Sequence, residues 1–267
     1  IGITRLSLGI QAVQENLLQR LGRIHTFDEA QAAVSNAKKA GFNNISLDLM
    51  YGLPYQTITM LQDSVNWFLQ QNIQHISIYG LQVEKGTPFA DMQKQGTLPL
   101  PNEETTEEMY DYITAYLPQH GFERYEISNF AQKGFESRHN MAYWQDKPYL
   151  GIGCAAHSYY NKNRTYNTHN VYDYINSCDK NILPVIEEEK LDNTAWMEEF
   201  CFLALRTTNG IDKNKFMQNF NCDIYDIYGK NISKLIAQQM LTDRDEHLSL
   251  TPLGMKFGNI AFESFLL

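Results

Sequence analysis

Three short segments near the start of the chain alternate apolar and polar residues with a period of two. The first places Leu6, Leu8 and Ile10 between small or polar residues, and the ranges 45–50 and 75–79 repeat the pattern. A period of two predicts β-strands with one apolar face and one polar face. These three strands constrain the fold more than any other feature of the sequence.

Helical patterns separate the predicted strands. Thr26 and Glu29 form a capping box ahead of an alanine-rich apolar stripe that Gly41 ends, and a second helix follows the break at 52–54. Strands that alternate with helices at this spacing predict βαβ units and a parallel sheet, so we expect an α/β fold.

The polar face of the strands favours a barrel or partial barrel whose interior receives a ligand. The central strands of an open doubly wound sheet would be apolar on both faces. Gln11, Asp48 and Tyr79 then lie near the carboxyl ends of strands on the inward side, which is the active face of such barrels. A simpler alternative is that Asp48 caps a loop and that Arg23 is a solvated helix residue.

Composition excludes several classes of function. The net charge of −9 argues against nucleic acid as a partner, and no apolar run reaches the roughly 20 residues of a membrane span. No signal-peptide pattern opens the chain, so we expect a cytoplasmic protein. Its four cysteines form no metal-binding motif and are expected to be reduced thiols.

Six sequence blocks in order resemble one family. They are RLSLGIQ at 5–11, LGRIH at 21–25, LDLMYGLP at 47–54, YEISNFA at 125–131, RHNMAYW at 138–144 and YLGIGCAAHS at 149–158. Together they resemble the radical S-adenosylmethionine (SAM) proteins related to oxygen-independent coproporphyrinogen III oxidase. The last three blocks are similar to the haem chaperone branch of that family.

The resemblance implies a SAM site at Gln11, Arg23 and Asp48. An amide, a guanidinium and a carboxylate can together hold the zwitterionic amino acid and the ribose hydroxyls of one ligand. Asp48 also lies on the inward side of its strand by the period-two pattern, which does not depend on the resemblance.

The chain departs from the family in one respect. The family's CxxxCxxC motif and glycine-rich SAM loop precede the segment where this chain begins, inside a predicted strand. We therefore expect an N-terminally truncated chain with the last three strands of a (β/α)6 partial TIM-like barrel. A longer protein would bind a [4Fe–4S] cluster, whereas this chain lacks the motif thiolates.

Three parts are expected along the chain. The range 1–100 is the C-terminal half of the radical SAM barrel, and 101–190 is a connecting region with pocket or lid segments. The range 191–267 resembles a small winged-helix-like domain, with a short wing at His247–Leu250 and a last helix through Ile260 and Phe265. From residue 192 onward 7 basic and 10 acidic residues give −3, which argues against DNA binding.

Haem is the ligand that the chaperone branch implies. His157 and His139 are the predicted axial ligands, because each lies among apolar or aromatic residues. Cys154 is a thiolate alternative, and His75 is a weaker third imidazole candidate. Both predicted histidines could instead hydrogen-bond backbone groups in a packed wall.

Three functions remain open from the sequence. The first is a haem chaperone that receives haem and passes it to an acceptor protein that the sequence does not identify. The second is an oxygen-independent coproporphyrinogen III oxidase, which acts through a 5′-deoxyadenosyl radical in porphyrin biosynthesis. The third is a SAM-binding barrel that acts on an unrelated small substrate.

Overall fold

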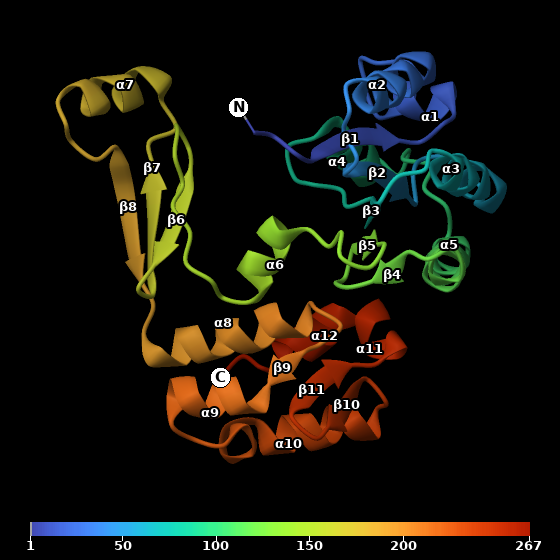
Figure 1. The fold of residues 1–267 in the computed structure, drawn as a ribbon. Helices are drawn as coiled ribbons and strands as arrows, with labels where there is room; N and C mark the ends of the chain where they lie inside the picture. The colour runs from blue at the N-terminus through green and yellow to red at the C-terminus, as the bar shows by residue number, and fades with distance from the viewer. Residues whose placement is uncertain (1) are drawn as a thin grey trace. The chain divides into compact units, whose positions relative to one another are not determined.

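The computed structural model describes residues 2–267 and divides the chain into two compact units (Figure 1). The first unit is Ile1–Glu136 and the second is Ser137–Leu267. Each unit has its own sheets and its own buried side chains, and each contains one of the two predicted sites.

The first unit is built on a five-stranded sheet with the order β1-β2-β3-β5-β4. Its strands are β1 (Leu6–Gln11), β2 (Ile45–Tyr51), β3 (His75–Gly80), β4 (Glu123–Arg124) and β5 (Asn129–Ala131). The first three strands are parallel, and β5 pairs with β3 in the antiparallel direction. The three strands and their parallel pairing are therefore confirmed.

Five helices connect these strands. They are α1 (Glu15–Arg20), α2 (Phe27–Lys39), α3 (Ile58–Gln70), α4 (Pro88–Lys94) and α5 (Glu103–Gln119). The predicted capping box is present at α2, where Thr26 and Glu29 exchange hydrogen bonds. Apolar side chains of α2, α3 and α5 pack on the apolar strand residues and form the main core, which includes Val34, Leu47, Phe68 and Ile113.

The opposite face of this sheet is polar. Gly9 pairs with Asp48, and Asp48 pairs with Ser77, so the three strands present these residues side by side on that face. Leu47 and Leu49, which flank Asp48 in the sequence, are fully buried in the helix-covered core. The period-two pattern thus predicted the sheet faces correctly.

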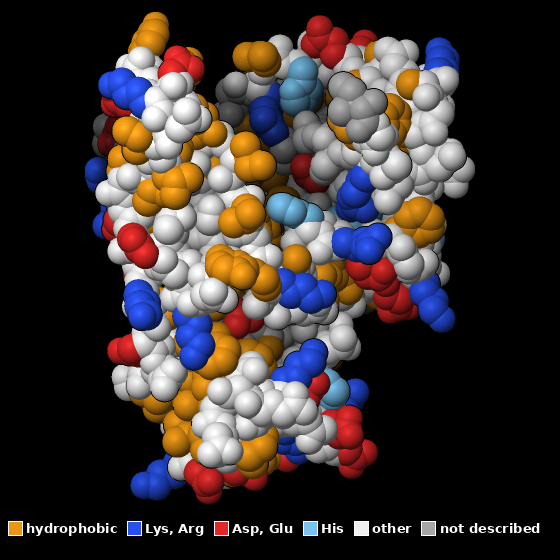
Figure 2. All heavy atoms as spheres, turned by 60° about the vertical axis from the view of Figure 1, so that its left-hand side comes forward, with side chains coloured by type: hydrophobic (Ala, Val, Ile, Leu, Met, Phe, Trp, Pro, Cys, Tyr) orange, Lys and Arg blue, Asp and Glu red, His pale blue; other side chains and the backbone are white. Residues whose placement is uncertain are grey.

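The second unit starts with α6 (Arg138–Trp144) and an antiparallel sheet of order β6-β7-β8. The strands are β6 (His157–Tyr160), β7 (Asn163–Asn167) and β8 (Val185–Lys190), and α7 (Val171–Asp179) connects β7 to β8. Hydrophobic side chains are exposed along this part of the unit, as Figure 2 shows, and Ile152, Tyr172 and Leu183 are among them.

The rest of the second unit combines helices with a small sheet of order β10-β11-β9. Its elements are α8 (Asn193–Leu205), β9 (Ile211–Asp212), α9 (Lys213–Phe220), α10 (Ile224–Ala237), β10 (Leu241–Arg244), β11 (His247–Leu250), α11 (Pro252–Lys256) and α12 (Gly258–Glu263). The predicted wing, His247–Leu250, is strand β11, which pairs with β10 in an antiparallel hairpin.

The last helix differs from the prediction. Phe257 has φ −114° and ψ 39°, outside the helical region, and it separates α11 from α12. The chain therefore turns at this residue, and α12 ends at Glu263, before Phe265. Across residues 2–267, no helix has both the length and the apolar character that crossing a bilayer requires.

Candidate binding sites

Gln11 and Arg23 meet above Gly9 at the end of β1. A Cβ atom added at Gly9 would lie 2.8 Å from Gln11 Nε2 and 3.1 Å from Arg23 Nη2. The strand register shifts between Gly9 and Gln11, and Gln11 has φ +71°. This bulge with a left-handed residue redirects the Gln11 side chain, and such irregularities often occur beside functional sites.

The Gln11 amide is buried but incompletely hydrogen-bonded. Its residue is 8% exposed, and Oε1 has no hydrogen-bond partner among the residues that the structure describes. A buried acceptor without a partner is costly in a folded protein, so it is suited to a ligand donor such as an ammonium or hydroxyl group. Arg23 beside it offers a cation to a carboxylate.

Asp48 lies on the same face of the sheet, paired with Gly9. Ser7 Oγ donates to Asp48 Oδ1 at 3.2 Å, and Ser77 also hydrogen-bonds the carboxyl. Burial raises the pKa of Asp48, while the hydrogen bonds from Ser77 and Ser7 and the charge of Arg23 oppose that rise. The structure therefore brings Gln11, Arg23 and Asp48 into one polar site.

Two other inward residues adjoin this site. Tyr79 hydrogen-bonds Ser77, and its pKa is raised by burial. His75 is 1% exposed, with Nδ1 2.7 Å from Ser46 Oγ and Nε2 2.8 Å from the Tyr125 hydroxyl. Burial lowers the pKa of His75 to about 3. Because both ring nitrogens already have partners, His75 is not placed to ligate haem.

A row of aromatic rings begins at His139 in the second unit. The ring centroid of His139 lies 4.9 Å from that of Tyr143, with the planes at 88°. Tyr143 is 4.6 Å from Tyr149, and Tyr149 is 6.2 Å from Tyr159. The row continues from α6 to β6, and His139 is exposed at its start.

His157 lies on the same sheet face as the end of this row. His157 and Tyr159 are two residues apart on β6, so both side chains point to the same face of the sheet. The His157 ring packs edge-on against Tyr166 of β7 at 4.2 Å between centroids. Both predicted histidines are exposed, and each packs against a tyrosine of the second unit.

Cys154 is half-buried, and its Sγ–H donates to the Thr168 carbonyl at 3.0 Å. This hydrogen bond occupies the thiol proton and holds the sulfur against the backbone, on the segment that leads into β6. Cys154 therefore remains a third candidate ligand, with a contact that haem binding would have to replace.

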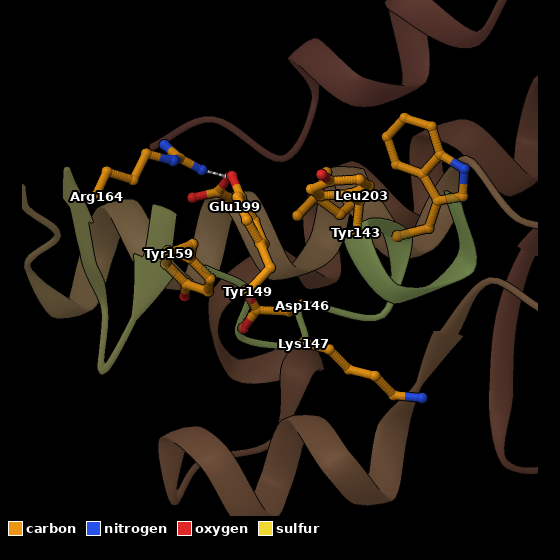
Figure 3. Close-up of a pocket in the computed structure, with 9 residues that line it drawn as sticks. Tyr143, Asp146, Lys147, Tyr149, Tyr159, Arg164, Glu199 and Leu203 are labelled. Atoms are coloured by element: carbon orange, nitrogen blue, oxygen red, sulfur yellow. Dashed lines mark hydrogen bonds and ion pairs between the residues drawn. The ribbon is translucent and has the colours of Figure 1, made fainter. Parts of the chain in front are cut away.

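A cavity of about 290 Å³ opens beside the aromatic row (Figure 3). Its lining residues are Tyr143, Trp144, Asp146, Lys147, Tyr149, Tyr159, Arg164, Glu199 and Leu203. Arg164 of β7 forms an ion pair with Glu199 of α8, as the dashed line in Figure 3 marks. Asp146 accepts a hydrogen bond from Trp196 Nε1 at 2.7 Å. Burial raises the pKa of both Asp146 and Glu199.

Sequence reasoning missed the charged residues of this cavity. Arg164 and Glu199 are 35 positions apart, and no motif connects them. The one available signal is the pair Glu198 and Glu199 within the mostly apolar α8, since a carboxylate that is buried there requires a partner. The identity of that partner depends on the tertiary fold. Sequence reasoning also missed Gly9, because the tertiary fold decides which side chains lie over it.

The cysteines do not form a cluster site. Cys154, Cys178, Cys201 and Cys222 are all free thiols, and Cys201 is buried with a pKa raised by burial. Within residues 2–267, no three cysteine, histidine or acidic side chains are grouped so that they could hold a metal ion. The residues present therefore do not fit a [4Fe–4S] cluster, which needs at least three thiolates from one protein site.

Two family patterns match the chain. The Radical SAM superfamily matches residues 1–68, and the HemN C-terminal domain matches residues 191–257. The first match contains Gln11, Arg23 and Asp48, and the second contains most of the helices that follow β8.

This chain is similar to curated proteins over nearly its whole length. The heme chaperone HemW of Lactococcus lactis is 38% identical over 99% of this chain and 69% of its own length. The heme chaperone HemW of Bacillus subtilis is 36% identical over 99% of this chain and 70% of its own length.

A solved structure, coproporphyrinogen III oxidase (HemN) from Escherichia coli, superposes with a TM-score of 0.80 at 18% identity. The superposition covers 99% of this chain and 64% of that one. It supports the predicted fold: part of a radical SAM barrel followed by a small C-terminal domain.

Proposed function

Because this chain belongs to the HemW family of radical SAM proteins, we propose that it binds haem and transfers it to an acceptor protein. The contact between His139 and Tyr143 supports this proposal most directly. It places an exposed imidazole at the edge of a continuous row of tyrosines, and haem requires both an axial ligand and an aromatic or apolar surface.

His139 is the first choice for the axial ligand, and His157 is the second. The acidic groups of the neighbouring cavity already have partners, since Glu199 is paired with Arg164 and Asp146 bonds Trp196. The Arg164 cation offsets the charge of Glu199, whereas the indole N–H that donates to Asp146 is neutral. Exposure of both imidazoles also suits a carrier that has to release its cargo.

A Soret titration tests this assignment. Haem is added to the unaltered chain and to the His139→Ala, His157→Ala and Cys154→Ala variants, with His120→Ala as a control histidine that hydrogen-bonds the Tyr116 carbonyl. We expect His139→Ala to shift the Soret band and weaken binding, and His120→Ala to leave both unchanged. If none of the three variants changes the band, the aromatic row is not the haem site.

The polar site of the first unit fits SAM, and we include SAM binding in the proposal. Arg23 would hold the carboxylate of the amino acid, Gln11 Oε1 its ammonium, and Asp48 the ribose hydroxyls. When bound, SAM supplies the adenosyl group on which radical SAM chemistry depends. The residues of this chain contribute by binding and orienting its polar groups.

The [4Fe–4S] cluster is part of the family's chemistry, but its ligands are not among the residues of this chain. A cytoplasmic location and an acceptor protein that takes haem complete the proposal. Turnover of coproporphyrinogen III by a protein that carries this chain together with a cluster-binding segment would instead favour the oxidase alternative.

A further inference from the structure

We propose that Gly9 is a positioning residue for the SAM site: its missing side chain leaves the space in which the Gln11 amide and the Arg23 guanidinium lie together. This inference rests on the proposed function, because it concerns the same site. A Cβ atom at residue 9 would lie 2.8 Å from Gln11 Nε2 and 3.1 Å from Arg23 Nη2.

The backbone itself does not require glycine at this position. Gly9 is an ordinary strand residue without a positive φ, and it pairs in register with Asp48. Glycine inside a strand costs conformational entropy and often marks a close approach by another group. Here the approaching groups are two polar side chains that the family resemblance assigns to SAM.

The bulge after Gly9 makes this close approach possible. Gln11 takes φ +71°, which is uncommon for a residue with a side chain, and its amide lies back over Gly9 rather than continuing the strand pattern. Its Oε1 remains without a partner among the described residues, although the residue is 8% exposed. The strain and the unpaired acceptor are both explained if a ligand donor occupies this point.

Replacing Gly9 with alanine should move both side chains and leave the fold intact. The atoms that a new Cβ would meet are the ends of flexible side chains, not backbone. We therefore expect Gly9→Ala to weaken SAM binding about tenfold or more, the size expected for displacing one hydrogen bond to a charged group. The melting temperature should stay close to that of the unaltered chain.

Two measurements test the proposal. The first is NMR of the Gln11 side-chain amide without ligand, in the unaltered chain and in Gly9→Ala. The matched control is Gly80→Ala in the same sheet, where a new Cβ would approach the Tyr51 ring at 3.0 Å and would lie near neither Gln11 nor Arg23. We expect the Gln11 amide signals to shift in Gly9→Ala and to stay in place in Gly80→Ala.

The second measurement is a calorimetric double-mutant cycle with SAM as the titrant. If Gly9 acts through Gln11, Gly9→Ala should cost much less affinity in the Gln11→Ala background than in the unaltered chain. Additive losses, or unchanged Gln11 amide signals in Gly9→Ala, would overturn the proposal. If SAM fails to bind the unaltered chain, the SAM part of the proposed function fails, while the NMR result still decides whether Gly9 positions Gln11.

Discussion

Ser46 Oγ lies 2.7 Å from Nδ1 of His75 on the neighbouring strand, and this contact fixes an uncharged imidazole inside the first unit. The pKa of His75 is about 3, mainly because of burial and also because of the charge of Arg5. In the unfolded chain the same group titrates near 6.5. Protonation therefore favours unfolding whenever the pH lies between these two values.

Stability should fall as the pH is lowered from about 6.5 towards 3. In this window the unfolded chain binds a proton at His75 and the native chain does not. The free energy of unfolding therefore rises with pH, by up to about 1.4 kcal/mol per pH unit. Urea unfolding at a series of pH values measures it. The same series on His75→Gln, which does not titrate, isolates the histidine contribution. Equal slopes for the two proteins would contradict the prediction.

Asp48→Ala should weaken SAM binding by about 1–3 kcal/mol, the range for hydrogen bonds to charged groups. Stability should change less, because burial already raises the pKa of this carboxyl, which means that the charged form is disfavoured there. Calorimetry gives the affinity, and thermal unfolding gives the stability. Ser77→Ala keeps the carboxylate and removes one of its hydrogen bonds, so its loss of affinity should be smaller. Unchanged affinity with a large fall in melting temperature would make Asp48 a structural residue.

The sheet of the first unit was predictable because its signals are local. A strand with one buried face alternates apolar and polar residues, and Leu6, Leu8 and Ile10 supply that pattern within five positions. Thr26 and Glu29 identify the start of α2 in the same way. The break in the last helix at Phe257 was missed although a local signal was present, because Gly258 follows the C-cap residue Phe257 directly, and glycine at this position commonly ends a helix.

The sites were predictable only in part. Resemblance identified Gln11, Arg23 and Asp48, and the structure brings them together. Neither resemblance nor periodicity indicated the bulge that turns Gln11 back over Gly9, because backbone strain has no sequence pattern of its own. The assignments to SAM and haem stay predictions until ligands are measured.

Glu199→Ala should destabilise the second unit by about 1.5–3 kcal/mol, because Arg164 would keep its partly buried position without its main partner. A weaker contact to Glu189, at 3.9 Å, would remain. Lys215→Ala is the control, since its pair with Asp212 is 3.9 Å long and largely exposed, and such pairs contribute little. Chemical denaturation of both variants checks this. Equal effects would show that the Arg164–Glu199 pair is no stronger than a surface pair.

The chain should show no iron–sulfur absorbance after anaerobic reconstitution with iron and sulfide. Cluster assembly needs at least three thiolates that converge on one point. Cys201 is buried with a raised pKa, and Cys178 is exposed on α7. The measurement is an absorbance spectrum with iron and sulfide analysis, and Cys178→Ser is the control for adventitious iron on an exposed thiol. A stoichiometric [4Fe–4S] spectrum that survives this substitution would mean that the cysteines can converge in a conformation different from the one described.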